Sequence, residues 1–130
     1  MTMMVRWVAA ITTAIVLIQA ILIGQALFFG DASRQALHGW LGNISFLGAI
    51  LLLGVIVMAY RRGELPRAAL ALGAIVAVLM LAQIGLGYSG RNGGWAAALH
   101  VPNGVLVSSL LTALLTVALL APAVTSRLRP

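Results

Sequence analysis

Two side chains of this 130-residue chain stand out as able to do chemistry, His38 and His100. They are the only histidines in the sequence. It also has no cysteine, which excludes disulfides, thiolate metal sites, iron–sulfur clusters and covalently attached c-type haem. Imidazole is a common metal ligand, but two histidines without a carboxylate or thiol partner are too few for zinc. Two imidazoles can instead fill both axial positions of a metal in a flat macrocycle such as haem.

The elements that must position the histidines are four long apolar segments. The chain is 62% hydrophobic and 8% charged, whereas a soluble domain has about a quarter charged residues. Helices are expected over residues 5–29, 35–60, 68–88 and 95–122, each as long as the roughly 20 residues that cross a bilayer. Because single segments in lipid must be helical, we expect one all-α integral membrane domain, residues 1–130.

The arginines predict the orientation of these helices. Two of the eight basic residues, Arg34 and Arg91, lie in the first and third connections. The other six lie at the N-terminus, in the middle connection and in the tail: Arg6, Arg61, Arg62, Arg67, Arg127 and Arg129. By the positive-inside rule both termini are cytoplasmic, in a bacterial inner membrane, and short connections favour an antiparallel up-down-up-down bundle. The net charge of +6 is therefore a topology signal rather than a nucleic-acid surface, and Glu64 is expected to be a solvated loop charge.

The two halves of the chain resemble one another and predict two similar hairpins. Each half has a mid-helix glutamine, an Ala-Leu-His triplet and an asparagine: Gln19, Ala36-Leu37-His38 and Asn43, then Gln83, Ala98-Leu99-His100 and Asn103. Both histidines thus fall near the outer ends of their helices, with His38 about 7 Å along the second helix at 1.5 Å per residue. We expect Gln19 and Gln83 to hydrogen-bond between helices.

The second and fourth helices are diagonal in such a bundle, roughly 11–14 Å apart given neighbour spacings of 8–10 Å. Two imidazoles reaching inward across that distance leave room for one bis-His haem. Pro102 follows His100 closely, so the last helix either starts late or kinks there. The alternative is that each histidine is simply a hydrogen-bonded packing residue.

Small and cationic residues surround the predicted site. Arg34 and Arg91 are the outer cations available to haem propionates, and Arg34 lies one helical turn before His38. Glycines at comparable depth would admit a macrocycle between the helices: Gly24, Gly39, Gly42, Gly87 and Gly104. Glycines also serve close helix packing in membranes, which is the alternative interpretation.

The segment Gln83-Ile84-Gly85-Leu86-Gly87, followed on the next helix by Ala98-Leu99-His100, resembles haem A synthase. That family is similar to two fused four-helix halves, each with histidines on its second and fourth helices, and this chain resembles one half over most of its length. The resemblance implies that His38 and His100 are haem ligands. The family's catalytic half has a carboxylate before its first histidine, where this chain has Gln35 and, further off, Asp31. In outline the chain also resembles small four-helix b-type membrane cytochromes.

The leading hypothesis is a haem b-binding membrane protein that transfers single electrons, or a haem-binding subunit of a membrane complex, rather than an enzyme. One alternative is a cofactor-free structural subunit of a respiratory or photosynthetic assembly. Another is a half-length haem A synthase-like enzyme that acts as a homodimer. Lipid and either other membrane subunits or a second copy are the expected partners. A quinone has no specific support in the sequence.

Overall fold

In the computed structural model, the structure describes the backbone of residues 1–127 and the side chains of residues 1–121. Four α-helices, α1 (Thr2–Phe29), α2 (Ala32–Arg61), α3 (Arg67–Ser89) and α4 (Gly94–Arg127), follow one another, with a short 3-10 helix, η1 (Gly90–Asn92), between α3 and α4. No strand occurs among the described residues, so the all-α prediction is confirmed. All four α-helices are long and apolar enough to cross a membrane, which indicates an integral membrane protein.

Local backbone chemistry fixes the helix ends: α1 ends at Phe29, as predicted, whereas the other three helices begin earlier than predicted by one to three residues. Gly30 ends α1 in the left-handed conformation at φ 66°, which glycine adopts without strain. Asp31 then caps α2, because its Oδ1 accepts the backbone N–H groups of Ser33 at 2.9 Å and Arg34 at 3.3 Å. The cap starts α2 three residues earlier than predicted. A late start of the last helix is wrong, since α4 begins at Gly94 and continues through the proline after His100.

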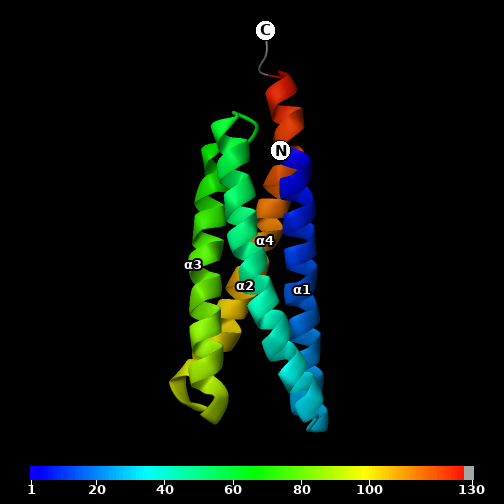
Figure 1. The fold of residues 1–130 in the computed structure, drawn as a ribbon, viewed down its shortest axis with the longest axis vertical. Helices are drawn as coiled ribbons and strands as arrows, with labels where there is room; N and C mark the ends of the chain where they lie inside the picture. The colour runs from blue at the N-terminus through cyan, green and yellow to red at the C-terminus, as the bar shows by residue number, and fades with distance from the viewer. Residues whose placement is uncertain (128–130) are drawn as a thin grey trace.

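The four helices pack in a ring. α1 contacts α2 and α4, and α3 contacts the same two helices. Within the described chain α2 and α4 are therefore diagonal partners rather than neighbours, as expected for a four-helix bundle. The α1–α2 connection and η1 lie at one end of the molecule, here called the histidine end. The N-terminus and the α2–α3 connection lie at the other end, here called the terminal end (Figure 1).

The buried core lies almost entirely in the terminal half of the bundle. Leu52, Ile56, Leu111 and Leu114 are its largest side chains, each about 1% exposed or less. In the histidine half, residues 20–44 and 82–106, only Ala26 and Ala96 are buried. The α1–α2 and α3–α4 hairpins diverge toward that end (Figure 1). The fold is thus tightly packed at one end and open at the other.

Polar contacts tie the terminal end together. Glu64 accepts hydrogen bonds from the Thr2 N–H and hydroxyl, both at 2.9 Å, and pairs with the Met1 amino group at 3.0 Å. The bond from the amino group, followed by those from Thr2, lowers the pKa of Glu64 to about 2. Glu64 is a partly exposed charge in the α2–α3 connection, as predicted, and it also binds Met1 and Thr2. Arg6 also links α1 to α4, since its Nε donates to the Ala118 carbonyl at 3.1 Å.

Candidate functional site

The two histidines occupy the same position on their helices and face one another across the bundle. His38 is six residues beyond Ala32, where α2 starts, and His100 is six residues beyond Gly94, where α4 starts. At 1.5 Å per residue both lie about 9 Å into their helices. The centroids of the two imidazole rings are 6.0 Å apart, with an angle of 74° between the ring planes. Diagonal helices thus bring the two rings into one shared space.

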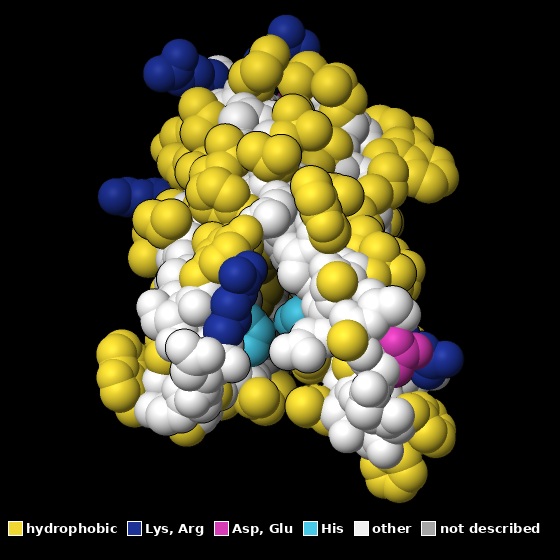
Figure 2. Space-filling view, turned by 60° about the horizontal axis from the view of Figure 1, so that its bottom comes forward, with side chains coloured by type: hydrophobic (Ala, Val, Ile, Leu, Met, Phe, Trp, Pro, Cys, Tyr) yellow, Lys and Arg dark blue, Asp and Glu magenta, His cyan; other side chains and the backbone are white. Residues whose placement is uncertain are grey.

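That space opens at the histidine end. Figure 2 shows histidine side chains in a hollow between two lobes of the molecular surface, seen from this end. The hollow exists because the buried core stops short of it. The nearest core side chains along α3 and α4 are Met80 and Val107, and both lie where the histidine half meets the packed terminal half. An open space with polar groups at its floor is the usual form of a ligand site.

His38 is held by the backbone of α1. Its Nδ1 lies 3.0 Å from the carbonyl oxygen of Gln19. Since a carbonyl only accepts, Nδ1 carries the proton and Nε2 keeps its lone pair. No described residue forms a hydrogen bond to Nε2. The Gln19 side chain is engaged elsewhere, because its Nε2 donates to Ser45 Oγ at 2.6 Å.

His100 is held by a series of side-chain hydrogen bonds between α3 and α4. The Nε2 of Gln83 lies 3.2 Å from the Nε2 of His100. Gln83 Oε1 in turn accepts from Asn103 Nδ2 at 2.5 Å, and the same Nδ2 donates to the Leu79 carbonyl at 3.0 Å. The Nδ1 of His100 is buried without a hydrogen-bond partner among the described residues. Gln19 and Gln83 therefore both bond between helices, as predicted.

The histidine pair fits axial ligation of haem in its spacing. Metal–imidazole bonds of about 2.0 Å, with ring nitrogens roughly 1.1 Å from the ring centre, place the centroids of two axial ligands about 6.2 Å apart when both nitrogens point at the metal. The observed separation is 6.0 Å. The residues present therefore fit the group that the sequence predicts.

The five predicted glycines divide into two sets. A Cβ added at Gly87 would lie 3.0 Å from His100 Cε1, and one at Gly104 would lie 3.0 Å from Gln83 Nε2. A Cβ at Gly42 would lie 3.3 Å from Gln19 Oε1. Gly87 thus leaves room for the His100 ring, and Gly104 and Gly42 leave room for the side chains of Gln83 and Gln19. Added Cβ atoms at Gly24 and Gly39 would meet nothing within 4 Å, so those two glycines border open space.

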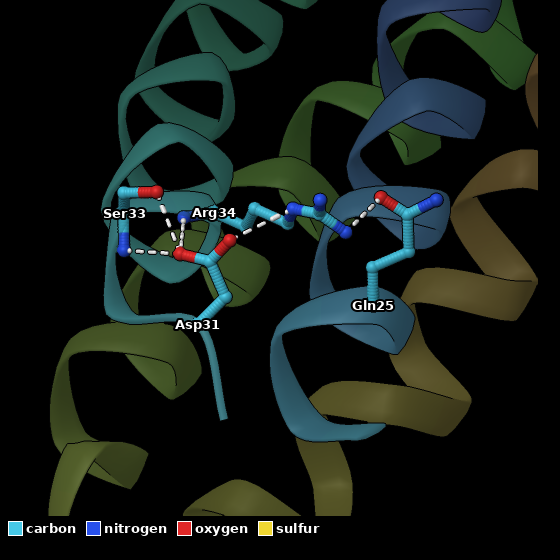
Figure 3. Close-up of polar contacts among 4 residues, drawn as sticks. All are labelled: Gln25, Asp31, Ser33 and Arg34. Atoms are coloured by element: carbon cyan, nitrogen blue, oxygen red, sulfur yellow. Dashed lines mark hydrogen bonds and ion pairs between the residues drawn. The ribbon is translucent and has the colours of Figure 1, made fainter. Parts of the chain in front are cut away.

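Arg34 is bound on its own hairpin. Its Nε pairs with Asp31 Oδ2 at 2.9 Å, and its Nη1 donates to Gln25 Oε1 at 2.8 Å (Figure 3). Asp31 itself is held by Ser33, whose hydroxyl and N–H both donate to it. These bonds, the Ser33 side-chain bond first, lower the pKa of Asp31. Arg34 would have to leave this cluster to reach a haem propionate.

Arg91 is the freer of the two predicted propionate partners. Its guanidinium carbon lies 4.4 Å from the centroid of the Tyr88 ring, a cation–π contact. The Tyr88 hydroxyl exchanges hydrogen bonds with the Asn43 amide at 3.2 and 3.4 Å, which links the two hairpins. Figure 2 shows one arginine side chain beside the histidines and another next to an acidic side chain on the other lobe.

Two contributions to the site were missed from the sequence. Asn103 orients the Gln83 amide, and the Ser45 hydroxyl accepts a hydrogen bond from Gln19. The repeat contained a signal for the first, since an asparagine follows each histidine. Asn43 and Asn103 nevertheless have different partners, which no sequence pattern indicates. On α4, four side-chain hydroxyls donate to backbone carbonyls four residues back in the same helix: Ser108, Ser109, Thr112 and Thr116.

One further depression lies on the side of the α1–α2 hairpin. It has a volume of about 290 Å³ and is lined mainly by apolar side chains such as Ile11, Ile15, Leu47 and Leu51. Neither histidine lines it. Because its lining is almost entirely apolar, this depression suits contact with lipid and offers no side chains for chemistry.

Comparisons with known proteins identify no relative of this chain. No protein-family model matches the chain, and neither a curated protein nor a solved structure matches it.

Proposed function

We propose that this chain is a haem b-binding integral membrane protein that carries one electron at a time through a single bis-His site. His38 and His100 are the axial ligands, near the outer face of a bacterial inner membrane. The bundle runs up-down-up-down, with both termini in the cytoplasm. This places Arg6, Arg61, Arg62 and Arg67 on the cytoplasmic side, in keeping with the positive-inside rule.

The observation that carries the proposal is the pair of opposed imidazoles in an open hollow. Their centroid separation of 6.0 Å matches the requirement of two axial ligands to within a few tenths of an ångström. They come from the diagonal pair of helices, so a flat ligand between them would have the other two helices at its edges. Ionisable side chains within membrane spans are functional by default.

Each protein group has a definite part in this arrangement. The Gln19 carbonyl would orient His38 through Nδ1 and leave its Nε2 available to a metal. The Gln83 amide holds His100 only in the metal-free protein, because it bonds to the Nε2 that would ligate. Arg91 is the cation available to a propionate, with Tyr88 supporting its guanidinium. Haem, when bound, supplies a reversible one-electron couple. Since two imidazoles would fill both axial positions, the site favours electron transfer over oxygen chemistry.

Electron donors and acceptors would be other chains or a second copy of this one. The described residues lie in four membrane-length helices and short connections, which leaves little surface outside the bilayer for a soluble partner. We therefore propose that the protein works within a larger membrane assembly or a homodimer.

The test is a reduced-minus-oxidised absorption spectrum of the detergent-purified protein, expressed with an adequate haem supply. The wild type should show a b-type signal, and both His38→Ala and His100→Ala should lose it. Leu37→Ala and Leu99→Ala are matched controls. Each is the direct neighbour of a histidine, about half exposed at 47% and 50%, and should keep the signal.

The absence of any haem signal in the wild type would refute the proposal. The cofactor-free structural subunit would then be favoured, with Gln19 and Gln83 as the groups that satisfy the histidines. A modified haem in the extract, identified by its mass, would instead favour the half-length haem-modifying enzyme.

A further inference from the structure

The two histidines are held by different devices, although both sit at the same depth. His38 donates to a backbone carbonyl on α1, which cannot change its role as an acceptor. His100 instead meets a side-chain amide on α3, which could in principle turn over and present its oxygen. Whatever fixes that amide therefore decides which nitrogen of His100 carries the proton.

The Gln83 amide is fixed by a chain of donors that ends on backbone. The Leu79 carbonyl can only accept, so the atom of Asn103 that contacts it at 3.0 Å must be the amide nitrogen. The same Asn103 nitrogen donates to Gln83 Oε1 at 2.5 Å, which turns the oxygen of the Gln83 amide toward Asn103. The Gln83 nitrogen is then the atom left to face His100, at 3.2 Å from Nε2.

An amide nitrogen can only donate, so His100 must accept through Nε2 and carry its proton on Nδ1. This is the tautomer that His38 also has, imposed there by the Gln19 carbonyl. In both rings Nε2 thus retains the lone pair that a metal requires. In this tautomer the buried N–H at Nδ1 of His100 has no hydrogen-bond acceptor among the described residues.

We propose that Asn103 and Gln83 are positioning residues that set the tautomer of His100 and reserve its Nε2 lone pair for a metal. The purpose of this relay rests on the proposed haem function, but the tautomer itself does not require haem. If His100 ligated a metal through Nε2, the Gln83 amide would have to give up its bond to that nitrogen. Asn43, the counterpart of Asn103 in the first hairpin, has no such role because it bonds to Tyr88.

The direct test is the ¹⁵N spectrum of metal-free protein labelled at its two histidines, in nanodiscs at about pH 9, where ordinary imidazoles are neutral. His38→Ala assigns the remaining resonances to His100. In the wild type both rings should be protonated at Nδ1. In Asn103→Leu and, independently, Gln83→Met, His100 should shift toward Nε2 protonation while His38 stays unchanged. Asn43→Leu, the matched control, should leave both rings as in the wild type.

A wild-type His100 protonated at Nε2 would overturn the inference. So would a His100 tautomer unchanged in both Asn103→Leu and Gln83→Met. Predicted tautomers in a wild type that binds no haem would refute the proposed function and uphold the relay.

Discussion

Replacing Gly87 by alanine should disturb the His100 site without disturbing the helix that carries it. An added Cβ would lie 3.0 Å from His100 Cε1 and 3.4 Å from Nδ1. Carbon atoms pack best at about 3.5–4.0 Å, so the ring must move by about half an ångström. Functional geometries are held to about that tolerance.

The size of the effect follows from this overlap. Overpacking of a tightly fitted site costs about 1–3 kcal/mol, which would weaken haem binding about 5- to 150-fold. The helix itself should gain, since alanine is favoured over glycine in a helix interior by about 0.5–1 kcal/mol. Gly87→Ala should therefore bind haem more weakly than the wild type. In the haem-free protein the helix gain offsets only part of the clash, so the thermal unfolding midpoint should change little or fall slightly.

Gly85→Ala is the matched control, because a Cβ there meets nothing within 4 Å on the same helix two residues away. Haem titration monitored by absorbance, together with thermal unfolding of the haem-free protein, would compare the two variants. Equal haem affinity in Gly85→Ala and Gly87→Ala would refute the reasoning. So would a large loss of haem binding in Gly85→Ala.

Two further predictions concern the ends of the bundle. Gly90→Ala should destabilise the α3–α4 hairpin by about 1–3 kcal/mol, because the added Cβ would lie 2.8 Å from the backbone nitrogen of Ala97, which cannot move aside. Thermal unfolding of this variant is compared with that of Ser89→Ala, and equal midpoints would contradict the prediction. Glu64, whose pKa is lowered to about 2 by its bond to the Met1 amino group, should stabilise the fold above pH 4.5 and progressively less as the pH falls to about 2. Glu64→Gln should lack this part of the pH dependence of the unfolding midpoint, and identical pH profiles would argue against it.

The open histidine half also explains why stability and function can be separated in this protein. The large buried side chains lie in the terminal half, around Leu52 and Leu111. Substitutions at the histidines remove few packing contacts of that core. Loss of function without loss of fold is therefore the expected behaviour of variants at His38 and His100.

Much of the fold was predictable from the sequence because its signals are local. Hydropathy over about 20 residues determines whether a segment can span a bilayer, and all four predicted spans coincide with helices of sufficient length. The cap at Asp31 and the turn at Gly30 follow equally from local backbone chemistry. The two histidines were identifiable from the sequence because they are the only ones and recur at the same place in each half.

What the tertiary structure decided was which groups these residues meet. Arg34 was expected to serve a haem propionate, but its guanidinium binds Asp31, the cap of its own helix, and Gln25 on α1, because a flexible side chain pairs with the nearest acceptors. The 6.0 Å between the two imidazoles depends on how far the hairpins diverge, which no single segment encodes. The tautomer of His100 likewise depends on a chain of bonds from α3 to α4, so it exists only once those two helices have packed.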